Sequence, residues 1–361
     1  MKQTLTTKVV PSLARGRERS AVKIMKRDGV ALAYEELGSG TPPLLFVHGW
    51  GCDHTFLAPQ AAFFSRNHRV VSVDLRGHGA SEAPHQDYTM AAFVADIAWQ
   101  CAQLRLERPI VVGHSMGGNV ALELAARHPE IPAAIVLIDS LILPPSSFFE
   151  ALRPLATALR RQDYLDVLQK IVSSLFIATD DPARKARLVA CMANTEQHVL
   201  ASSFSNHVTD YDATDAAHAS RVPTAYIGAT VSMADMVRFR AACAQLMTAQ
   251  TLGSGHFAPL EVPDQINSML LRFITVNTDI IEQVFGVATE VRPSRSRIDN
   301  MYRSGHTNLL QTRCKSMSAD CMQTKSPELD RDQLGHTETS EPTGLEPATS
   351  AVTGRRSNQL S

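Results

Sequence analysis

The part of this sequence best suited to chemistry is a serine between small residues, in Gly113-His-Ser-Met-Gly117. Three apolar β-formers, residues 110–112, precede it, and a helix-compatible run that begins at Val120 follows it. This order predicts a strand, an abrupt turn and a helix, with Ser115 at the apex. Such a turn holds the serine at a strained backbone angle, so its flanking residues must be small. Free N–H groups at the start of the helix would face an anion that forms near Ser115.

A serine hydroxyl is a poor nucleophile at neutral pH and needs a base, a group that orients the base, and donors for the oxyanion. Among thirteen histidines, His256 is the strongest candidate base, because it follows a predicted strand in a glycine-rich loop. A parallel strand delivers such a residue to the same sheet edge as Ser115. We expect His114 to point away from Ser115, and His48 to hold its own loop by hydrogen bonds.

The oxyanion donors are predicted to be two backbone amides from different loops. One is the N–H of Trp50, in His48-Gly-Trp-Gly51, which directly follows an apolar strand. The other is the N–H of Met116, which comes directly after the serine. This pairing is typical of a strained serine turn at the edge of an α/β sheet.

Two aspartates are candidates for the group that orients the base. Asp139 ends a predicted strand that follows the helix after Ser115, and Asp235 follows the predicted strand at residues 224–228. Both aspartates could reach the far side of the histidine ring. The residues alone leave the choice between them open.

Short apolar runs alternate with helical patterns along most of the chain, which predicts an α/β fold. The expected architecture is a mostly parallel, doubly wound sheet with helices on both faces. The long helical insertion at residues 144–220 interrupts this rhythm and is a candidate lid over the site. The predicted strands lie at residues 30–36, 43–47, 69–74, 110–112, 133–139, 224–228 and 250–252. Helices are expected from Thr89, around 148–159, around 164–176, after 181–182 and from 263 to 273.

The domain organisation predicted from these patterns has four parts. The α/β core would comprise residues 25–143 and 221–277, with the insertion between its two halves. Residues 1–24 are polar and basic, and we expect a disordered N-terminal extension there. Residues 278–361 are expected to form a disordered tail, because most of this segment is rich in Ser, Thr, Arg, Asp and Pro. Its last part, residues 342–356, resembles a read-through or fusion product and is expected to be non-native.

Composition narrows the classes of partner. A net charge of −1 provides no basic field for nucleic acid and no polybasic membrane patch. No apolar run approaches the roughly 18 residues of a membrane helix, and no secretory signal is recognisable. Six scattered cysteines fit neither a zinc spacing nor a disulfide framework, so free thiols in a reducing cytoplasm are expected. No metal or organic cofactor is implied.

The chain from about Val30 to Phe273 resembles the α/β-hydrolase superfamily, in the branch with an HGxG oxyanion loop and a helical lid. Four motifs carry the resemblance, in the expected order: His48-Gly-Trp-Gly51, Asp74-Leu-Arg-Gly-His-Gly-Ala-Ser81, Gly113-His-Ser-Met-Gly-Gly118 and Gly255-His256. In that family the serine is the nucleophile, the late histidine is the base, and the acid follows one of two strands. The commoner acid position falls on Val231, so the resemblance favours Asp139 over Asp235.

The resemblance implies hydrolysis of esters, thioesters or lactones, carbon–carbon bond hydrolysis, perhydrolysis or a cofactor-independent dioxygenase reaction. We predict a serine hydrolase that cleaves small carboxylic esters or lactones through an acyl-enzyme on Ser115. The alternatives are the dioxygenase and the carbon–carbon hydrolase on the same fold, and then a non-catalytic ligand receptor. The predicted partner is a small ester-like molecule. The aliphatic residues of the lid helices predict an apolar pocket, although ordinary packing of the lid on the core would explain most of them.

Overall fold

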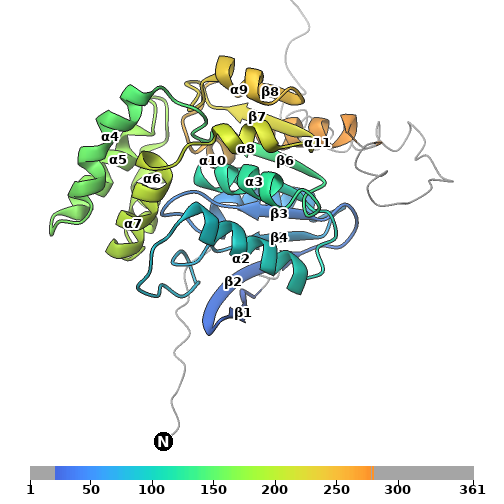
Figure 1. Ribbon diagram of the computed structural model, residues 1–361, viewed down its shortest axis with the longest axis horizontal. Coiled ribbons are helices and arrows are strands. Elements are labelled where there is room, and N and C mark those ends of the chain that lie inside the picture. Colours follow the sequence, from blue (N-terminus) through green and yellow to red (C-terminus); the bar gives the residue numbers. More distant parts are fainter. Residues whose placement is uncertain (1–20, 278, 280–361) are drawn as a thin grey trace, which may run out of the picture. The chain divides into compact units, whose positions relative to one another are not determined.

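The computed structural model describes residues 21–277 and residue 279 of this chain. Within these residues eight strands form one sheet in the order β1-β2-β4-β3-β5-β6-β7-β8 (Figure 1). The first three strands in this order pair antiparallel, and all the others pair parallel. The predicted fold class, a mostly parallel α/β sheet, is therefore confirmed. The strands are β1 (Lys23–Arg27), β2 (Val30–Leu37), β3 (Leu44–Val47), β4 (Val70–Val73), β5 (Ile110–His114), β6 (Ala134–Ile138), β7 (Thr224–Gly228) and β8 (Leu246–Gln250).

The central strands are continuous apolar runs because both of their faces are covered. Every residue of β3, β4, β5 and β6 is buried. Successive side chains alternate between two separate cores: Val111 belongs to one core, and its neighbours Ile110 and Val112 belong to the other. The parallel register places the C-terminal ends of β5 and β6 side by side, and polar residues follow both strands there.

Helices form a layer on each face of the sheet (Figure 1). One layer contains α2 (Met90–Gln103), α3 (Met116–Arg127), α8 (Thr214–Ala219) and α9 (Met236–Ala242). The other contains α1 (Ala58–Phe64), α10 (Ala258–Glu261) and α11 (Pro263–Val276), next to the short helix η1 (His54–Leu57). The predicted cap at Thr89 is confirmed, because its hydroxyl accepts from the Ala92 N–H at 3.2 Å.

A helical insertion separates β6 from β7 and lies beside one end of the sheet (Figure 1). It comprises α4 (Ser146–Ala158), α5 (Tyr164–Ser174), α6 (Pro182–Met192), α7 (Gln197–Phe204) and the π-helical turn η2 (Ser205–Thr209). The three helices predicted in its first half correspond to α4, α5 and α6. Asp181 caps α6 through its contact with the Ala183 N–H, and Pro182 opens that helix. Helix α8 follows the insertion and packs against α3.

Two predictions at the edges of the sheet are wrong. The predicted disordered extension includes residues 23 and 24, but β1 begins at Lys23, which forms an ion pair with Glu36 of β2 at 2.7 Å. The last strand is predicted at residues 250–252, but β8 ends at Gln250. Both are edge strands with exposed residues, so they lack the apolar run on which the prediction relies. The predictions for residues 1–20 and 280–361 lie outside the described residues.

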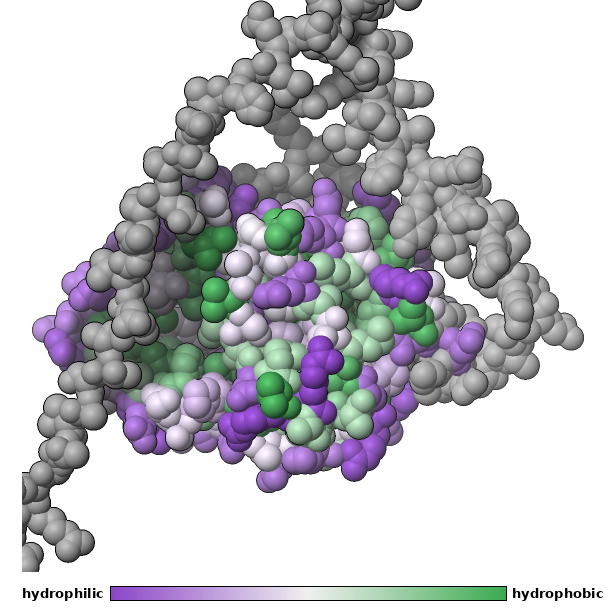
Figure 2. All heavy atoms as spheres, turned by 90° about the horizontal axis from the view of Figure 1, so that it is seen from above, coloured by the Kyte–Doolittle hydropathy of each residue, from purple (hydrophilic) through white to green (hydrophobic). Residues whose placement is uncertain are grey.

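The described surface carries hydrophobic residues interspersed with hydrophilic ones on the face shown in Figure 2. Large exposed apolar side chains include Val237 and Leu252, near the β8 edge of the sheet. Among the helices of the described chain, none combines the length and the apolar character needed to cross a membrane.

Candidate active site

Ser115 lies in a strained turn between β5 and α3. Its backbone angles are φ 54° and ψ −123°, in a region that residues with a side chain rarely adopt. Such a conformation costs on the order of 1–3 kcal/mol and persists only where the surroundings impose it. Here the Ser115 N–H donates to the Ile138 carbonyl at 2.9 Å, and the Gly118 N–H donates to the Ser115 carbonyl at 3.0 Å. The sheet and the helix therefore hold the serine at the predicted apex.

The two glycines around the serine are required by close backbone approaches. A Cβ atom on Gly113 would lie 2.1 Å from the Gly117 carbonyl oxygen. A Cβ atom on Gly117 would lie 2.2 Å from the carbonyl oxygen of Val47, at the end of β3. Both separations are far below contact distance, so any side chain would push α3 away from the sheet.

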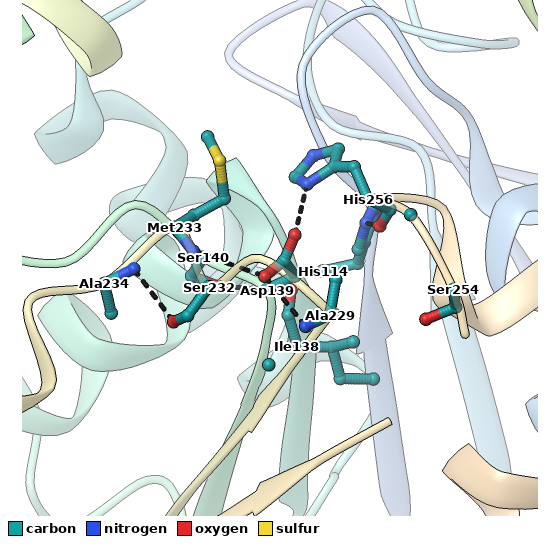
Figure 3. Close-up of polar contacts among 12 residues, drawn as sticks. His114, Ile138, Asp139, Ser140, Ala229, Ser232, Met233, Ala234, Ser254 and His256 are labelled. Carbon is teal, nitrogen blue, oxygen red and sulfur yellow. Dashed lines mark hydrogen bonds and ion pairs between the residues drawn. The ribbon is translucent and has the colours of Figure 1, made fainter. Parts of the chain in front are cut away.

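His256 and Asp139 form a buried, hydrogen-bonded pair at the carboxyl ends of the parallel strands (Figure 3). His256 Nδ1 lies 2.7 Å from Asp139 Oδ2, and the side chains are 7% and 1% exposed. The other carboxylate oxygen, Oδ1, accepts from the Ala229 N–H at 3.1 Å and the Met233 N–H at 3.4 Å. Because the carboxylate only accepts, Nδ1 carries the imidazole proton and Nε2 keeps a free lone pair. That is the tautomer which a general base requires.

The second candidate acid is held elsewhere. Asp235 caps α9, and its Oδ1 accepts from the Val237 N–H at 3.1 Å and the Arg238 N–H at 3.0 Å. The structure therefore brings Asp139 to His256 and does not bring Asp235 there. At the position where the family commonly has its acid, Val231 is 76% exposed.

Contacts from two other segments place the backbone of His256. His114 Nε2 donates to the His256 carbonyl at 2.8 Å, and the two rings lie 4.8 Å apart between centroids. The His256 N–H donates to the carbonyl of Leu175 in the insertion at 3.1 Å. Burial, with the neighbouring His256, lowers the pKa of His114 to about 3, so His114 is a neutral donor here. His256 is thus anchored to the residue that precedes Ser115. The described hydrogen bonds do not include one between Ser115 Oγ and His256, a contact that often tightens only when substrate binds.

The loop after β3 lies directly against the serine. A Cβ atom on Gly49 would be 3.0 Å from Ser115 Cβ. Among the described residues, neither the Trp50 amide nor the Met116 amide donates to an acceptor, so both remain available to a ligand. The Trp50 ring is fixed to the insertion, because its Nε1–H donates to the Leu200 carbonyl at 3.0 Å.

His48 has the structural role expected of it. Its Nδ1 lies 2.8 Å from the Gly49 carbonyl, and its Nε2 accepts from the Leu75 N–H at 3.0 Å. The first bond lies within the loop after β3, and the second connects this loop to the loop after β4. Burial lowers the pKa of this ring, so it is a neutral imidazole.

The sequence prediction does not identify a buried ion pair next to this loop. Asp74 Oδ1 accepts from the backbone N–H of His54 at 2.7 Å and lies 2.8 Å from His54 Nδ1, while Oδ2 accepts from the Ala80 N–H at 2.9 Å. Burial opposes the charge on His54, but the hydrogen bond and the charge of Asp74 outweigh it and raise the pKa of His54 to about 9. The pair stabilises the first turn after the oxyanion loop. Its only signal in the sequence is the Asp74–Ser81 motif.

Within residues 21–277, Cys52, Cys101, Cys191 and Cys243 are free thiols. No group of three or more His, Cys, Asp or Glu side chains in that part of the chain is arranged to hold a metal ion. The site is built from one serine, two histidines, one aspartate and backbone amides.

Comparisons with known proteins support the fold. A family model described as the alpha/beta hydrolase fold matches residues 42–214. A putative esterase/lipase of Haemophilus influenzae is 32% identical over 132 residues, which cover 36% of this chain and 45% of that protein. A hydrolase from Pseudomonas aeruginosa PA01 superposes with a TM-score of 0.61 at 26% identity, over 70% of this chain and 98% of that one. An enol-lactonase from Burkholderia xenovorans LB400 gives a TM-score of 0.63 at 24% identity, over 70% of this chain and 100% of that one.

This chain belongs to the α/β-hydrolase superfamily. The curated relatives are matched over 33% to 56% of their own length. The match to the family model includes the oxyanion loop, the serine turn, Asp139 and most of the insertion, and it ends before β7.

Proposed function

We propose that this chain is a serine hydrolase that cleaves small carboxylic esters or lactones through an acyl-enzyme on Ser115. The observation that carries the proposal is the 2.7 Å contact between His256 Nδ1 and Asp139 Oδ2, on a loop tied to the residue before Ser115. That arrangement supplies a base with a free nitrogen, anchored through its backbone to the residue that precedes the strained serine. A nucleophile, a base and an acid that orients the base are the three groups that acyl transfer of this kind uses.

In the proposed reaction Ser115 Oγ bonds to the substrate carbonyl carbon while its proton passes to His256 Nε2. The imidazolium then gives this proton to the leaving oxygen, the C–O bond breaks, and the alcohol departs. A water molecule repeats the sequence on the acyl-enzyme, again with His256 as base, and releases the acid. Asp139 fixes the tautomer and stabilises the imidazolium.

The negative charge of the tetrahedral intermediate would be bound by the Trp50 and Met116 amides. Both are unpaired among the described residues, and they come from loops at the ends of β3 and β5. One such donor typically contributes about 3 kcal/mol to stabilisation of the transition state. The Met116 N–H also opens α3, whose dipole favours negative charge at that end.

The insertion would act as a lid and provide an apolar wall. Phe176 packs on Phe257, the neighbour of His256, with 4.9 Å between ring centroids. Apolar surface next to a catalytic base suits a small uncharged acyl group. The relative named a putative esterase/lipase supports an ester as the substrate class.

The test is turnover of p-nitrophenyl acetate and butyrate by the wild type, Ser115→Ala and a control variant, Ser174→Ala. Ser174 is an exposed serine at the end of α5. We expect loss of about 10⁴-fold or more in kcat for Ser115→Ala and no change for the control. A fluorophosphonate should label Ser115 and no other serine. Equal rates for the wild type and Ser115→Ala would rule out the mechanism. Oxygen consumption with N-heteroaromatic substrates, without ester turnover, would support the dioxygenase instead.

A further inference from the structure

The insertion contributes a buried histidine that the proposed mechanism does not use. His207 lies in the π-helical turn η2 and is 4% exposed. The turn closes with a bond from the Asp210 N–H to the Ser205 carbonyl at 3.0 Å, five residues earlier. Single π-helical turns occur frequently at functional sites, because they displace one residue from the regular helix. A buried imidazole on such a turn therefore needs a chemical explanation.

The hydrogen bonds of Asn119 determine the tautomer of His207. The Asn119 side chain donates through Nδ2 to the Leu141 carbonyl at 2.8 Å, so its amide oxygen is an acceptor. His207 Nε2 lies 3.1 Å from this oxygen and must be the N–H donor. Burial, followed by the influence of His256, lowers the pKa of His207 to about 3. The ring is therefore neutral, and its Nδ1 carries a lone pair.

This lone pair has no partner in the described part of the chain. His207 Nδ1 is shielded from solvent and accepts no hydrogen bond from any described residue. Burying an acceptor without a donor is unfavourable, and folded proteins rarely keep such groups without a use. The acceptor is therefore unused by the described residues.

The surroundings of His207 belong to the candidate active site. Its partner Asn119 lies in the first turn of α3, the helix that begins directly after Ser115. Asn119 also donates to the Leu141 carbonyl, two residues after Asp139, which is the partner of His256. The unused acceptor therefore lies in the neighbourhood of the nucleophile and the base.

We propose that His207 Nδ1 accepts a hydrogen bond from a hydroxyl or amide N–H of the substrate. The preferred ester or lactone then carries such a donor in addition to its reacting carbonyl. This inference rests on the proposed function and deepens it by naming the substrate class. In this role His207 is a specificity-determining residue rather than a participant in bond breaking.

The competing explanation is that His207 only anchors the insertion to α3 through Asn119. Two substitutions separate the two roles, because each keeps one polar position of the imidazole. The amide nitrogen of His207→Gln can take the place of Nε2 and keep the bond to Asn119, while the acceptor at the Nδ1 position is lost. The amide oxygen of His207→Asn can take the place of Nδ1, while the bond to Asn119 is lost.

The experiment compares kcat/KM for two matched pairs of esters. On the acyl side these are p-nitrophenyl 3-hydroxybutyrate and p-nitrophenyl butyrate, and on the alcohol side 2-hydroxyethyl butyrate and propyl butyrate. One neutral hydrogen bond corresponds to a preference of about tenfold for the hydroxylated member of a pair. We expect this preference in the wild type for at least one pair, its loss in His207→Gln and its retention in His207→Asn. Melting temperatures of the variants show whether each is folded.

The outcomes are distinguishable from one another. Wild-type turnover of both esters in each pair, with ratios near one, would overturn the inference while leaving the proposed function intact. A preference that survives in His207→Gln and disappears in His207→Asn would also overturn it, in favour of the anchoring role. If the wild type hydrolyses none of the four esters and Ser115 resists a fluorophosphonate, the proposed function itself fails.

Discussion

Replacement of Asp139 by asparagine changes one atom of the candidate site and reverses one hydrogen bond. In Asp139→Asn the new amide oxygen, at the position of Oδ1, can still accept from the Ala229 and Met233 amides, which lie at 3.1 and 3.4 Å. The new amide nitrogen then faces His256 Nδ1 at the former 2.7 Å contact and can only donate. The imidazole must therefore shift its proton to Nε2, where it can no longer accept the proton of Ser115.

The expected loss in kcat is about 10⁴-fold, the magnitude typical when the orienting acid is replaced by its amide. The matched control is Asp235→Asn. Asp235 caps α9 at a half-buried position, and asparagine is an equally good N-cap. We expect its kcat and melting temperature to match those of the wild type.

The assay is p-nitrophenyl butyrate hydrolysis by three purified proteins, with circular dichroism to show that each is folded. The reasoning is refuted if Asp139→Asn retains kcat within about tenfold of the wild type, because a wrong tautomer costs far more than that. It is equally refuted if Asp235→Asn loses as much activity as Asp139→Asn, since the described contacts of Asp235 do not include the base.

Two further predictions concern stability. Gly117→Ala would place a methyl group 2.2 Å from the Val47 carbonyl oxygen, so we expect a loss of about 3 kcal/mol or more in the free energy of unfolding. Gly29→Ala, at φ 85° with open space around it, should cost only about 1 kcal/mol in urea denaturation, and equal losses would contradict the steric argument. The pKa of His54 is raised from 6.5 to about 9 by Asp74, so the folded state holds a proton that the unfolded state releases earlier. The protonated pair stabilises the folded state by about 3 kcal/mol at most. This contribution is complete below pH 6.5 and is lost as the pH rises through 9. His54→Gln should remove this part of the pH dependence of the urea midpoint, and an unchanged profile would disprove the assignment.

The features predicted correctly from sequence are those with a strong local cause. The strands β3 to β7 are apolar runs whose burial follows from their composition, and the Thr89 cap depends on neighbouring atoms only. The serine turn belongs to the same group, because Gly113 and Gly117 stand at the positions where no side chain fits. The edge strands β1 and β8 are missed or shifted in the prediction. Their pairing depends on partners distant in sequence, and their exposed residues carry no apolar pattern.

By itself, the sequence determined which residues were available for chemistry: a serine at a strained turn, a late histidine, two aspartates and two loops rich in glycine. Only the tertiary structure shows which aspartate lies against His256. The chain after β7 turns its Ala229 and Met233 amides towards Asp139 and leaves Asp235 to cap a helix. The acceptor on His207 likewise has no signal in the sequence, because its tautomer depends on Asn119, 88 residues away along the chain. Hydrogen bonds between distant segments set the protonation and orientation of these groups, and a linear pattern does not contain that information.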